Sequence, residues 1–112
     1  MGCNVLRTVG SAQVQMLDGI RVLDLATLAA APLVATYLGE FGADVIKVEE
    51  PQHGDPIRAW GNQRDGVGLM WKSISRNKRS IRLDLRCADG QGLVSWLVDH
   101  AVVSMFTTRP PT

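Results

Sequence analysis

Cysteines, long apolar runs and an excess of charge of either sign are all scarce in this sequence. Of its 112 residues only Cys3 and Cys87 are cysteines, too few for a disulfide framework and typical of a reducing compartment. No apolar run approaches the roughly eighteen residues of a membrane span, and residues 1–15 lack the apolar stretch of a signal peptide. The 12 Lys and Arg nearly balance the 11 Asp and Glu, which argues against a nucleic-acid or membrane-surface binder. We therefore expect a cytoplasmic protein that binds neither nucleic acid nor membrane.

The common signatures of catalytic and cofactor sites are also missing. Gly90 and Gly92 begin a dinucleotide-binding pattern, but Ser95 stands where its third glycine should be. No phosphate-binding loop ends in Gly-Lys-Ser/Thr, and the histidines and cysteines lack the spacing of metal ligands. His53 and Asp55 resemble an acid–base pair, although solvated turn residues are the better interpretation of both. We expect neither a metal nor a covalently bound cofactor.

The first half of the chain predicts a strand, a helix and a second strand. Residues 1–16 show no period of two or 3.6, and we expect an unstructured extension there. The apolar residues 20–25 predict a strand covered on both faces. A helix then begins at Pro32 and ends at Gly42, and residues 44–49 predict a second, parallel strand. The stripe that we expect this helix to bury consists of Leu33, Val34, Tyr37, Leu38 and Phe41.

The second half predicts a loop followed by further strands and a helix. Residues 50–72 are rich in glycine and proline and predict a long loop. Residues 80–86 alternate apolar and polar side chains and predict a half-exposed strand. Asp89 is predicted to cap a helix that runs to about His100, and residues 102–106 predict a last strand. We expect this second helix to bury Leu93, Trp96, Leu97 and Ala101. The whole pattern predicts an α/β fold, a parallel sheet with flanking helices.

Three features carry candidate chemistry. Asp24 is a possible nucleophile, but a strand-end carboxylate that orders the next loop is the better interpretation. A bend of small residues joins the first strand to the helix N-terminus, where ligands bind in open α/β sheets and phosphates meet free N–H groups; a tight packing turn explains it equally well. The basic residues would suit a ligand with several phosphates, although a solvated strand face explains them better. These basic residues are Arg76, Lys78, Arg79, Arg82 and Arg86.

Taken in order, these segments resemble one known family. The matching segments are residues 17–25, Pro32, residues 38–39 and 42–49, Gly54-Asp55, Arg58, Trp60-Gly61, and residues 76–81 and 83–85. They are similar to the start of family III CoA-transferases, the carnitine-dehydratase/bile-acid-operon (CaiB/BaiF) family that includes formyl-CoA transferase, over roughly residues 17–101. The α-methylacyl-CoA racemases share the fold, but Trp60-Gly61 and the long loop look more like the transferases.

The resemblance implies a Rossmann-like domain of which residues 17–112 form a truncated N-terminal portion. It implies CoA-binding positions at Thr27, Leu28, Ala29, Ala30, Leu83, Arg86 and Arg109. The sequence also departs from the family pattern. Glu50 stands where many members carry Arg, Thr107 and Thr108 replace an Asn-Phe pair that contacts CoA, and Pro111 replaces a glycine.

The resemblance also implies a reaction. Family members move CoA from an acyl-CoA to a carboxylic acid through an aspartyl-CoA intermediate, and their subunits form an interlinked homodimer. Their nucleophilic Asp matches no residue here and lies beyond residue 112, so we expect this chain alone to be inactive. The expected ligands are CoA or an acyl-CoA and a carboxylic acid. The alternatives are a truncated remnant, a CoA-binding or pairing module without catalysis, and a relative of the racemases.

Overall fold

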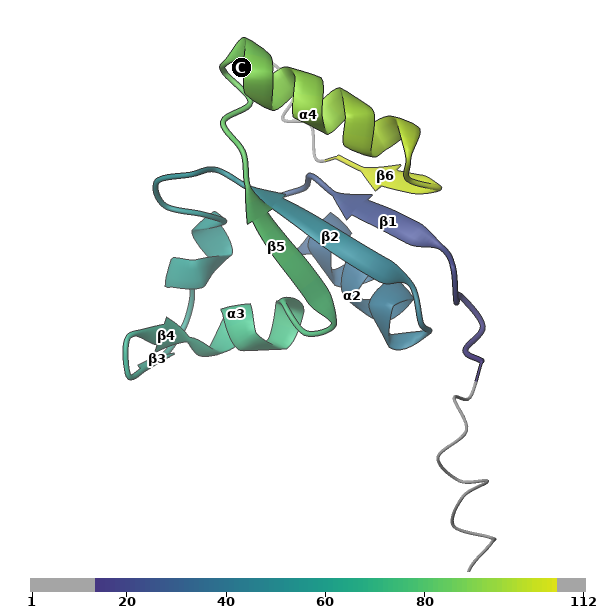
Figure 1. Cartoon of the computed structure of the whole chain (residues 1–112). Helices are drawn as coiled ribbons and strands as arrows, with labels where there is room; N and C mark the ends of the chain where they lie inside the picture. Colours follow the sequence, from purple (N-terminus) through teal and green to yellow (C-terminus); the bar gives the residue numbers. More distant parts are fainter. Residues whose placement is uncertain (1–13, 107–112) are drawn as a thin grey trace, which may run out of the picture.

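A parallel sheet of four strands lies at the centre of the protein (Figure 1). This computed structural model describes residues 14–106. The strands are β1 (Arg21–Asp24), β2 (Asp44–Glu49), β5 (Lys78–Arg82) and β6 (Val103–Met105). They lie in the order β5-β2-β1-β6 with parallel pairing throughout. Numbered along the chain, this is the order 3-2-1-4 with which doubly wound nucleotide-binding sheets begin. The prediction of an α/β fold with a parallel sheet is confirmed.

Helix α2 (Ala30–Glu40) covers one face of the sheet through its small side chains. Ala35 packs with Val22 and Val45 in one core cluster, and the buried Thr36 hydroxyl lies 2.9 Å from the Pro32 carbonyl oxygen and 2.6 Å from that of Ile74. The predicted stripe is wrong except for Leu38, which packs against this cluster. Its other members are 37% to 54% exposed, namely Leu33, Val34, Tyr37 and Phe41. Because α2 is apolar on most sides, periodicity alone did not identify the face that approaches the sheet.

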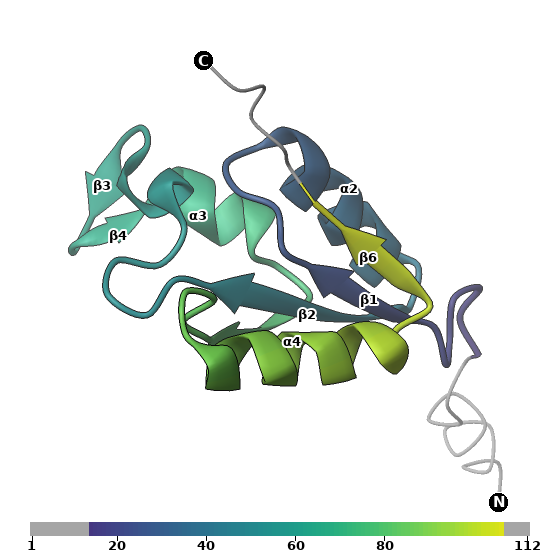
Figure 2. The same ribbon diagram turned by 90° about the horizontal axis from the view of Figure 1, so that it is seen from above.

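Helix α4 (Ala88–Asp99) covers the opposite face (Figure 2). The residues that pack on Leu23, Ile46 and Val48 of the sheet include Val94, Leu97, Val98 and Ala101. Leu97 and Ala101 confirm half of the predicted stripe, whereas Leu93 and Trp96 are 54% and 55% exposed. The N-cap is the free thiol Cys87, whose Sγ accepts a bond from the Gly90 N–H at 3.4 Å, so the predicted cap Asp89 lies inside the first turn.

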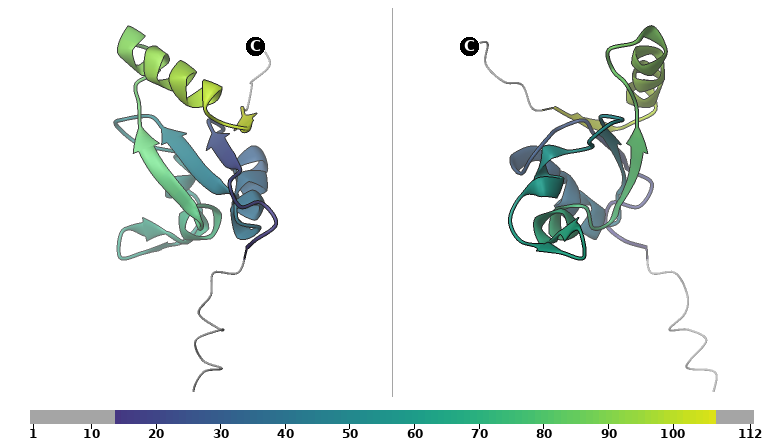
Figure 3. Two further views of the ribbon diagram at one scale, coloured as in Figure 1. Left: turned by 45° about the vertical axis from the view of Figure 1, so that its right-hand side comes forward. Right: turned by 90° about the vertical axis from the view of Figure 1, so that its left-hand side faces the viewer.

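The predicted long loop contains several short elements. They are a 3-10 helix, η1 (Pro56–Ala59), a hairpin of β3 (Gln63–Arg64) and β4 (Val67–Gly68), and helix α3 (Leu69–Ile74). In Figures 1 and 3 this hairpin and α4 lie at opposite ends of the molecule. Asp65 and Gly66 turn the hairpin with positive φ angles of 54° and 77°. Asp-Gly is a strong hairpin signal, but strands of two residues are too short to show an alternating pattern.

The third predicted strand is displaced along the chain. Residues 80–86 alternate, yet β5 spans Lys78–Arg82 and the chain then leaves the sheet. The Leu83 N–H still donates to the Glu49 carbonyl at 3.0 Å. Asp84 then accepts from the Arg86 N–H at 3.0 Å, which forms a turn. The other strands agree with prediction within one residue at each end. None of the helices within residues 14–106 is long and apolar enough to cross a membrane.

Candidate functional site

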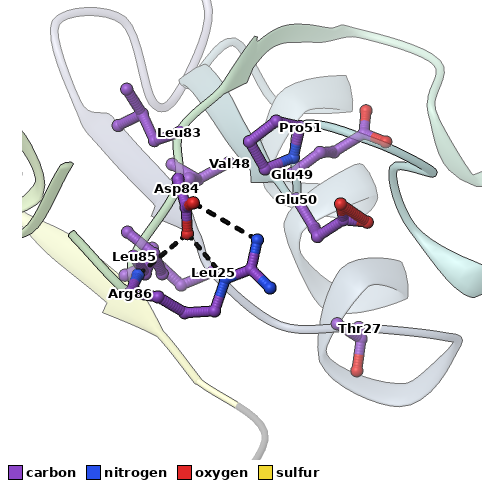
Figure 4. Close-up of a pocket in the computed structure, with 10 residues that line it drawn as sticks. All are labelled: Leu25, Thr27, Val48, Glu49, Glu50, Pro51, Leu83, Asp84, Leu85 and Arg86. Carbon is purple, nitrogen blue, oxygen red and sulfur yellow. Dashed lines mark hydrogen bonds and ion pairs between the residues drawn. The ribbon is translucent and has the colours of Figure 1, made fainter.

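A pocket of about 260 Å³ opens at the carboxyl ends of β1, β2 and β5 (Figure 4). Its lining consists of Leu25, Thr27, Val48, Glu49, Glu50, Pro51, Leu83, Asp84, Leu85 and Arg86. Among the site residues predicted from the sequence, Thr27, Leu83 and Arg86 are thus brought together. Residues 28–30 belong to the same loop but do not line this pocket, and Arg109 lies outside the described residues. This edge of a parallel sheet is where ligands bind in open α/β folds.

An adjacent pocket of about 230 Å³ lies beside the first across the end of β2. The two pockets share Thr27, Val48, Glu49 and Glu50, and Gly54, Asp55 and Pro56 complete the second one. Thr27 and Glu50 therefore contact both spaces.

Most of the first pocket's wall is apolar, and four charged residues also line it, namely the buried Glu49, the half-buried Asp84 and the exposed Glu50 and Arg86. Figure 4 shows Arg86 joined to Asp84 at one side of the pocket and Glu50 and Thr27 at the other. Arg86 Nε lies 2.9 Å from Asp84 Oδ1, and its Nη2 lies 3.2 Å from Oδ2. These hydrogen bonds raise the pKa of Arg86 and lower that of Asp84. Arg86 thus presents a cation that is already paired, with its planar face available to a ligand.

Glu50 is one of the residues at which the sequence departs from the family pattern. Its Oε1 accepts from the Gln52 N–H at 2.5 Å and its Oε2 from the His53 N–H at 3.0 Å, so the carboxylate holds the turn after β2. The backbone bonds from His53 and then Gln52 lower the pKa of Glu50. A charged carboxylate therefore faces both pockets and opposes a phosphate at this position.

Glu49 is buried beside it with three sets of partners. Arg58 donates from Nε to Glu49 Oε2 and from Nη2 to Glu49 Oε1, both at 2.8 Å. Ser80 Oγ lies 2.6 Å from Oε1, and the Asp55 N–H donates to Oε2 at 2.8 Å. Burial alone would raise the pKa of Glu49, but these hydrogen bonds outweigh it and lower the pKa from 4.5 to about 2. The Arg58 guanidinium also lies 3.7 Å from the centre of the Trp71 ring. Glu49 therefore ties the ends of β2 and η1 to β5.

Four ionised side chains, the buried quartet, lie beneath the loop between β1 and α2. The quartet consists of Asp24, Lys47, Asp55 and Lys78, whose side chains are 0% to 1% exposed. Lys47 Nζ lies 2.8 Å from Asp55 Oδ2 and 3.6 Å from Asp24 Oδ2, and Lys78 Nζ lies 2.9 Å from Asp24 Oδ2. Burial lowers the pKa of Lys78, although the bond to Asp24 opposes the shift. Two anions and two cations balance each other in this group.

The buried quartet hydrogen-bonds the backbone of the loop above it. Asp24 Oδ1 accepts from the Ala26 N–H at 3.2 Å, which confirms the interpretation of Asp24 as a carboxylate that orders the next loop. Lys47 Nζ donates to the Ala26 carbonyl at 2.8 Å, and Lys78 Nζ to the Pro32 carbonyl at 2.6 Å. Sequence reasoning missed Lys47, although a lysine inside the apolar strand 44–49 is a usable signal because buried lysines are almost always paired.

The other sequence candidates do not converge. His53 Nδ1 lies 3.6 Å from Glu50 with its side chain 85% exposed, which confirms its interpretation as a solvated turn residue. The same interpretation of Asp55 is wrong, because its side chain is buried against Lys47. Each basic side chain has a separate partner: Arg76 with Glu40, Lys78 with Asp24, Arg79 with Asp44, Arg82 with the Pro51 carbonyl and Arg86 with Asp84. Within residues 14–106 no three His, Cys, Asp or Glu residues are arranged to hold a metal ion.

Comparison with known proteins agrees with this geometry. Residues 17–112 match the model of CoA-transferase family III. The chain belongs to CoA-transferase family III. It is 47% identical over 97 residues to succinyl-CoA–D-citramalate CoA-transferase of Chloroflexus aurantiacus, a match that covers 86% of this chain and 24% of that protein. It is 36% identical over 94 residues to human succinyl-CoA:glutarate CoA-transferase, a match that covers 83% of this chain and 21% of that protein.

Solved structures of the family share this fold. A CaiB/BaiF family protein from Brucella suis superposes with a TM-score of 0.76 at 40% identity, over 84% of this chain and 26% of that one. Protein Rv3272 of Mycobacterium tuberculosis gives a TM-score of 0.78 at 32% identity, over 88% of this chain and 27% of that one. This family III chain thus spans about a quarter of the length of the relatives that it matches.

Proposed function

We propose that this chain is the N-terminal CoA-binding segment of a CoA-transferase, which moves CoA from an acyl-CoA to a carboxylic acid. The observation that carries the proposal is the pocket at the carboxyl edge of the sheet, where Thr27, Leu83 and Arg86 meet. These residues come from two segments that the family resemblance had assigned to CoA, the loop at Thr27 and the segment of Leu83 and Arg86. The relatives' names identify them as CoA-transferases that use succinyl-CoA, which supports a CoA thioester as the ligand class.

The pocket suits the adenine end of CoA. Its apolar wall of Leu25, Val48, Leu83 and Leu85 offers a surface on which a flat ring can pack. The Arg86 guanidinium can stack on a base while Asp84 holds it in place. The phosphates would then extend toward the N-terminus of α2, whose first turn contains no acidic residue and whose N-cap Ala29 makes no side-chain bond.

Glu49, Glu50 and Asp84 line this pocket, but none of them matches the nucleophilic Asp that the family resemblance implies. In the proposed mechanism an Asp beyond residue 112 attacks the thioester carbonyl and releases CoA as a thiolate, leaving a mixed anhydride. The thiolate then attacks the aspartyl carbonyl, which releases the donor acid and forms an aspartyl-CoA thioester. The acceptor acid finally takes the CoA by the reverse sequence.

A CoA-binding or pairing module without catalysis is the second candidate. The observation that favours it is the exposed apolar surface outside α2 and α4, which includes Val34, Tyr37, Phe41, Leu93 and Trp96, each 49% to 55% exposed. Surface of this kind marks an interface with another protein or with a further part of the same one.

Calorimetric titration of the chain with CoA tests the proposed site. We expect weak binding, and we expect Arg86→Ala to weaken it roughly tenfold because a charged stacking partner contributes about 1–2 kcal/mol. Arg79→Ala is the matched control, since Arg79 is an exposed β5 arginine paired with Asp44 away from the pocket. Equal affinity of the Arg86 variant and the unaltered chain would remove Arg86 from the site.

A further inference from the structure

Leu28 has a backbone conformation that its residue type disfavours. Its φ is 66°, and the other non-glycine residues with positive φ within the described part of the chain are Asp65 and Asn77. Asp and Asn adopt this left-handed region with some ease, whereas a bulky residue there is an outlier. Such conformations persist when the surroundings enforce them, and they are concentrated at functional sites. Leu28 directly follows Thr27, which lines both pockets.

Asp55 and Lys47 of the buried quartet enforce this conformation from below. Asp55 Oδ1 accepts from the Leu28 N–H at 3.1 Å and from the Ile57 N–H at 2.9 Å. Asp55 Oδ2 lies 2.8 Å from Lys47 Nζ, which donates to the Ala26 carbonyl at 2.8 Å. The backbone is therefore held on both sides of Thr27 by a single ion pair.

We propose that the Lys47–Asp55 pair is a positioning device for CoA. It holds Leu28 in the left-handed conformation and thereby fixes the path of residues 26–30 at the edge of both pockets. The proposal rests on the proposed function in that CoA is the ligand. The Asp55 and Lys47 side chains are each only 1% exposed and bond to the loop backbone, so they are positioning residues and not catalytic ones.

Stability alone is a poor explanation of this arrangement. Buried ion pairs repay their desolvation only with good geometry, and apolar replacements of similar size are often as stable. The hydrogen bonds of the paired groups do provide direction, because Asp55 Oδ1 and Lys47 Nζ each bond to a fixed backbone partner. Here those partners are the Ala26 carbonyl and the Leu28 N–H, which flank the pocket residue Thr27.

A cycle of variants separates the backbone effect from loss of a side chain. Asp55→Ala is combined with unaltered Leu28, with Leu28→Ala and with Leu28→Gly, and CoA affinity is measured by calorimetry. Alanine keeps the penalty for positive φ, whereas glycine removes it. We expect Asp55→Ala to weaken CoA binding about tenfold beside Leu28 or Leu28→Ala, and less than threefold beside Leu28→Gly. Asp65→Gly, which relieves a positive φ in the distant hairpin, should leave CoA affinity unchanged.

Asp55→Asn covers the case in which Asp55→Ala does not fold. Asparagine keeps an oxygen that accepts from the Leu28 and Ile57 N–H groups but removes the charge facing Lys47. Because the bond to the Leu28 N–H is kept and only the pairing with Lys47 is lost, we expect CoA affinity to fall by about threefold at equal fraction folded, less than in Asp55→Ala. Unchanged CoA affinity in Asp55→Asn would overturn the positioning role of the ion pair.

Hydrogen exchange at the Leu28 amide tests the clamp without any ligand. We expect slow exchange in the unaltered chain and fast exchange in Asp55→Ala, and fast exchange in the unaltered chain would overturn the clamp. If the unaltered chain binds no CoA, the proposed function fails and the positioning role fails with it. If it binds CoA but equally well with and without Asp55→Ala, only the positioning role is wrong.

Discussion

The Glu49 carboxylate joins three segments of the chain at the edge of the candidate site. It receives bonds from Arg58 on η1, from Ser80 on β5 and from the Asp55 N–H. These bonds lower the pKa of Glu49 to about 2, because they favour the ionised carboxylate and exist only in the folded protein. The same residue therefore makes the site sensitive to acid.

Glu49→Gln should change the dependence of stability on pH. The pKa of Glu49 is about 2 in the folded protein, and its ordinary value is 4.5. The contribution of Glu49 to the free energy of unfolding is therefore complete above pH 4.5 and is lost as the pH falls through about 2. We expect the variant to be less stable than the unaltered chain by roughly 2–3 kcal/mol at pH 7, with a smaller loss between pH 4.5 and 2. Urea unfolding at several pH values measures both quantities.

Ser80→Ala provides an intermediate case. It removes one of the hydrogen bonds to Glu49 and leaves the Arg58 pair in place. We therefore expect Ser80→Ala to lower the stability at pH 7 as well, but by less than Glu49→Gln does. Identical pH slopes in all three proteins would show that Glu49 does not contribute in this way.

The buried residues of the site were the least predictable from the sequence. Asp24 was interpreted correctly because a carboxylate at a strand end has few roles. Asp55 was interpreted as a solvated turn residue, since glycine and proline surround it and nothing in its neighbourhood shows burial. Its partners Lys47 and Leu28 lie 8 and 27 positions away along the chain, so only the folded structure brings the three together.

At the scale of elements, the sequence predicted where strands and helices begin and end better than it predicted which faces of the helices are buried. Strand β2 spans the predicted residues 44–49, because β-branched residues bounded by turns give a clear signal. The two predicted helices were placed correctly, whereas α3 and η1 begin in the predicted loop and were missed. Helices α2 and α4 expose apolar residues that were expected to be buried. Periodicity ranks faces by hydrophobicity, whereas packing on this sheet selected small residues in α2 that allow a close approach.

Two glycines of α4 test the packing of this helix. A Cβ at Gly90 would lie 1.9 Å from the Asp84 carbonyl oxygen, whereas a Cβ at Gly92 would meet no atom within 4 Å. We expect Gly90→Ala to destabilise the chain by about 2–3 kcal/mol. Gly92→Ala should stabilise it by about 0.5–1 kcal/mol, because alanine favours a helix over glycine. Urea unfolding of both variants checks the pair, and equal effects would show that α4 does not pack against the 83–86 turn.

At the scale of the whole molecule, the sheet order 3-2-1-4 and the exposed outer faces of α2 and α4 belong together. The chain spans about a quarter of the length of its relatives, and gathered apolar side chains on a surface mark a contact with another part of the protein or another chain. We propose that further parts of a family III protein, or a second chain, pack on the exposed side chains of these helices. The sequence could not predict this surface, because it depends on which face of each helix meets the sheet.

We predict that this chain by itself transfers no CoA. Catalysis needs a free carboxylate against the thioester carbonyl and donors for the developing oxyanion. The Asp residues of β1, β2 and the loops of the site are already paired: Asp24 with Lys78, Asp44 with Arg79, Asp55 with Lys47 and Asp84 with Arg86. Each would have to break an ion pair to act as a nucleophile, and loss of a covalent nucleophile costs many orders of magnitude in rate.

The measurement is mass spectrometry of new acyl-CoA after the chain is mixed with succinyl-CoA or formyl-CoA and a panel of carboxylic acids. Heat-denatured chain is the control, and we expect equal signals from both. Turnover above this control, or an aspartyl-CoA adduct trapped on Asp24, Asp44, Asp55, Asp65 or Asp84, would contradict the prediction. Such an adduct would place the nucleophile within the residues described here, at a carboxylate that can leave its ion pair when an acyl-CoA binds.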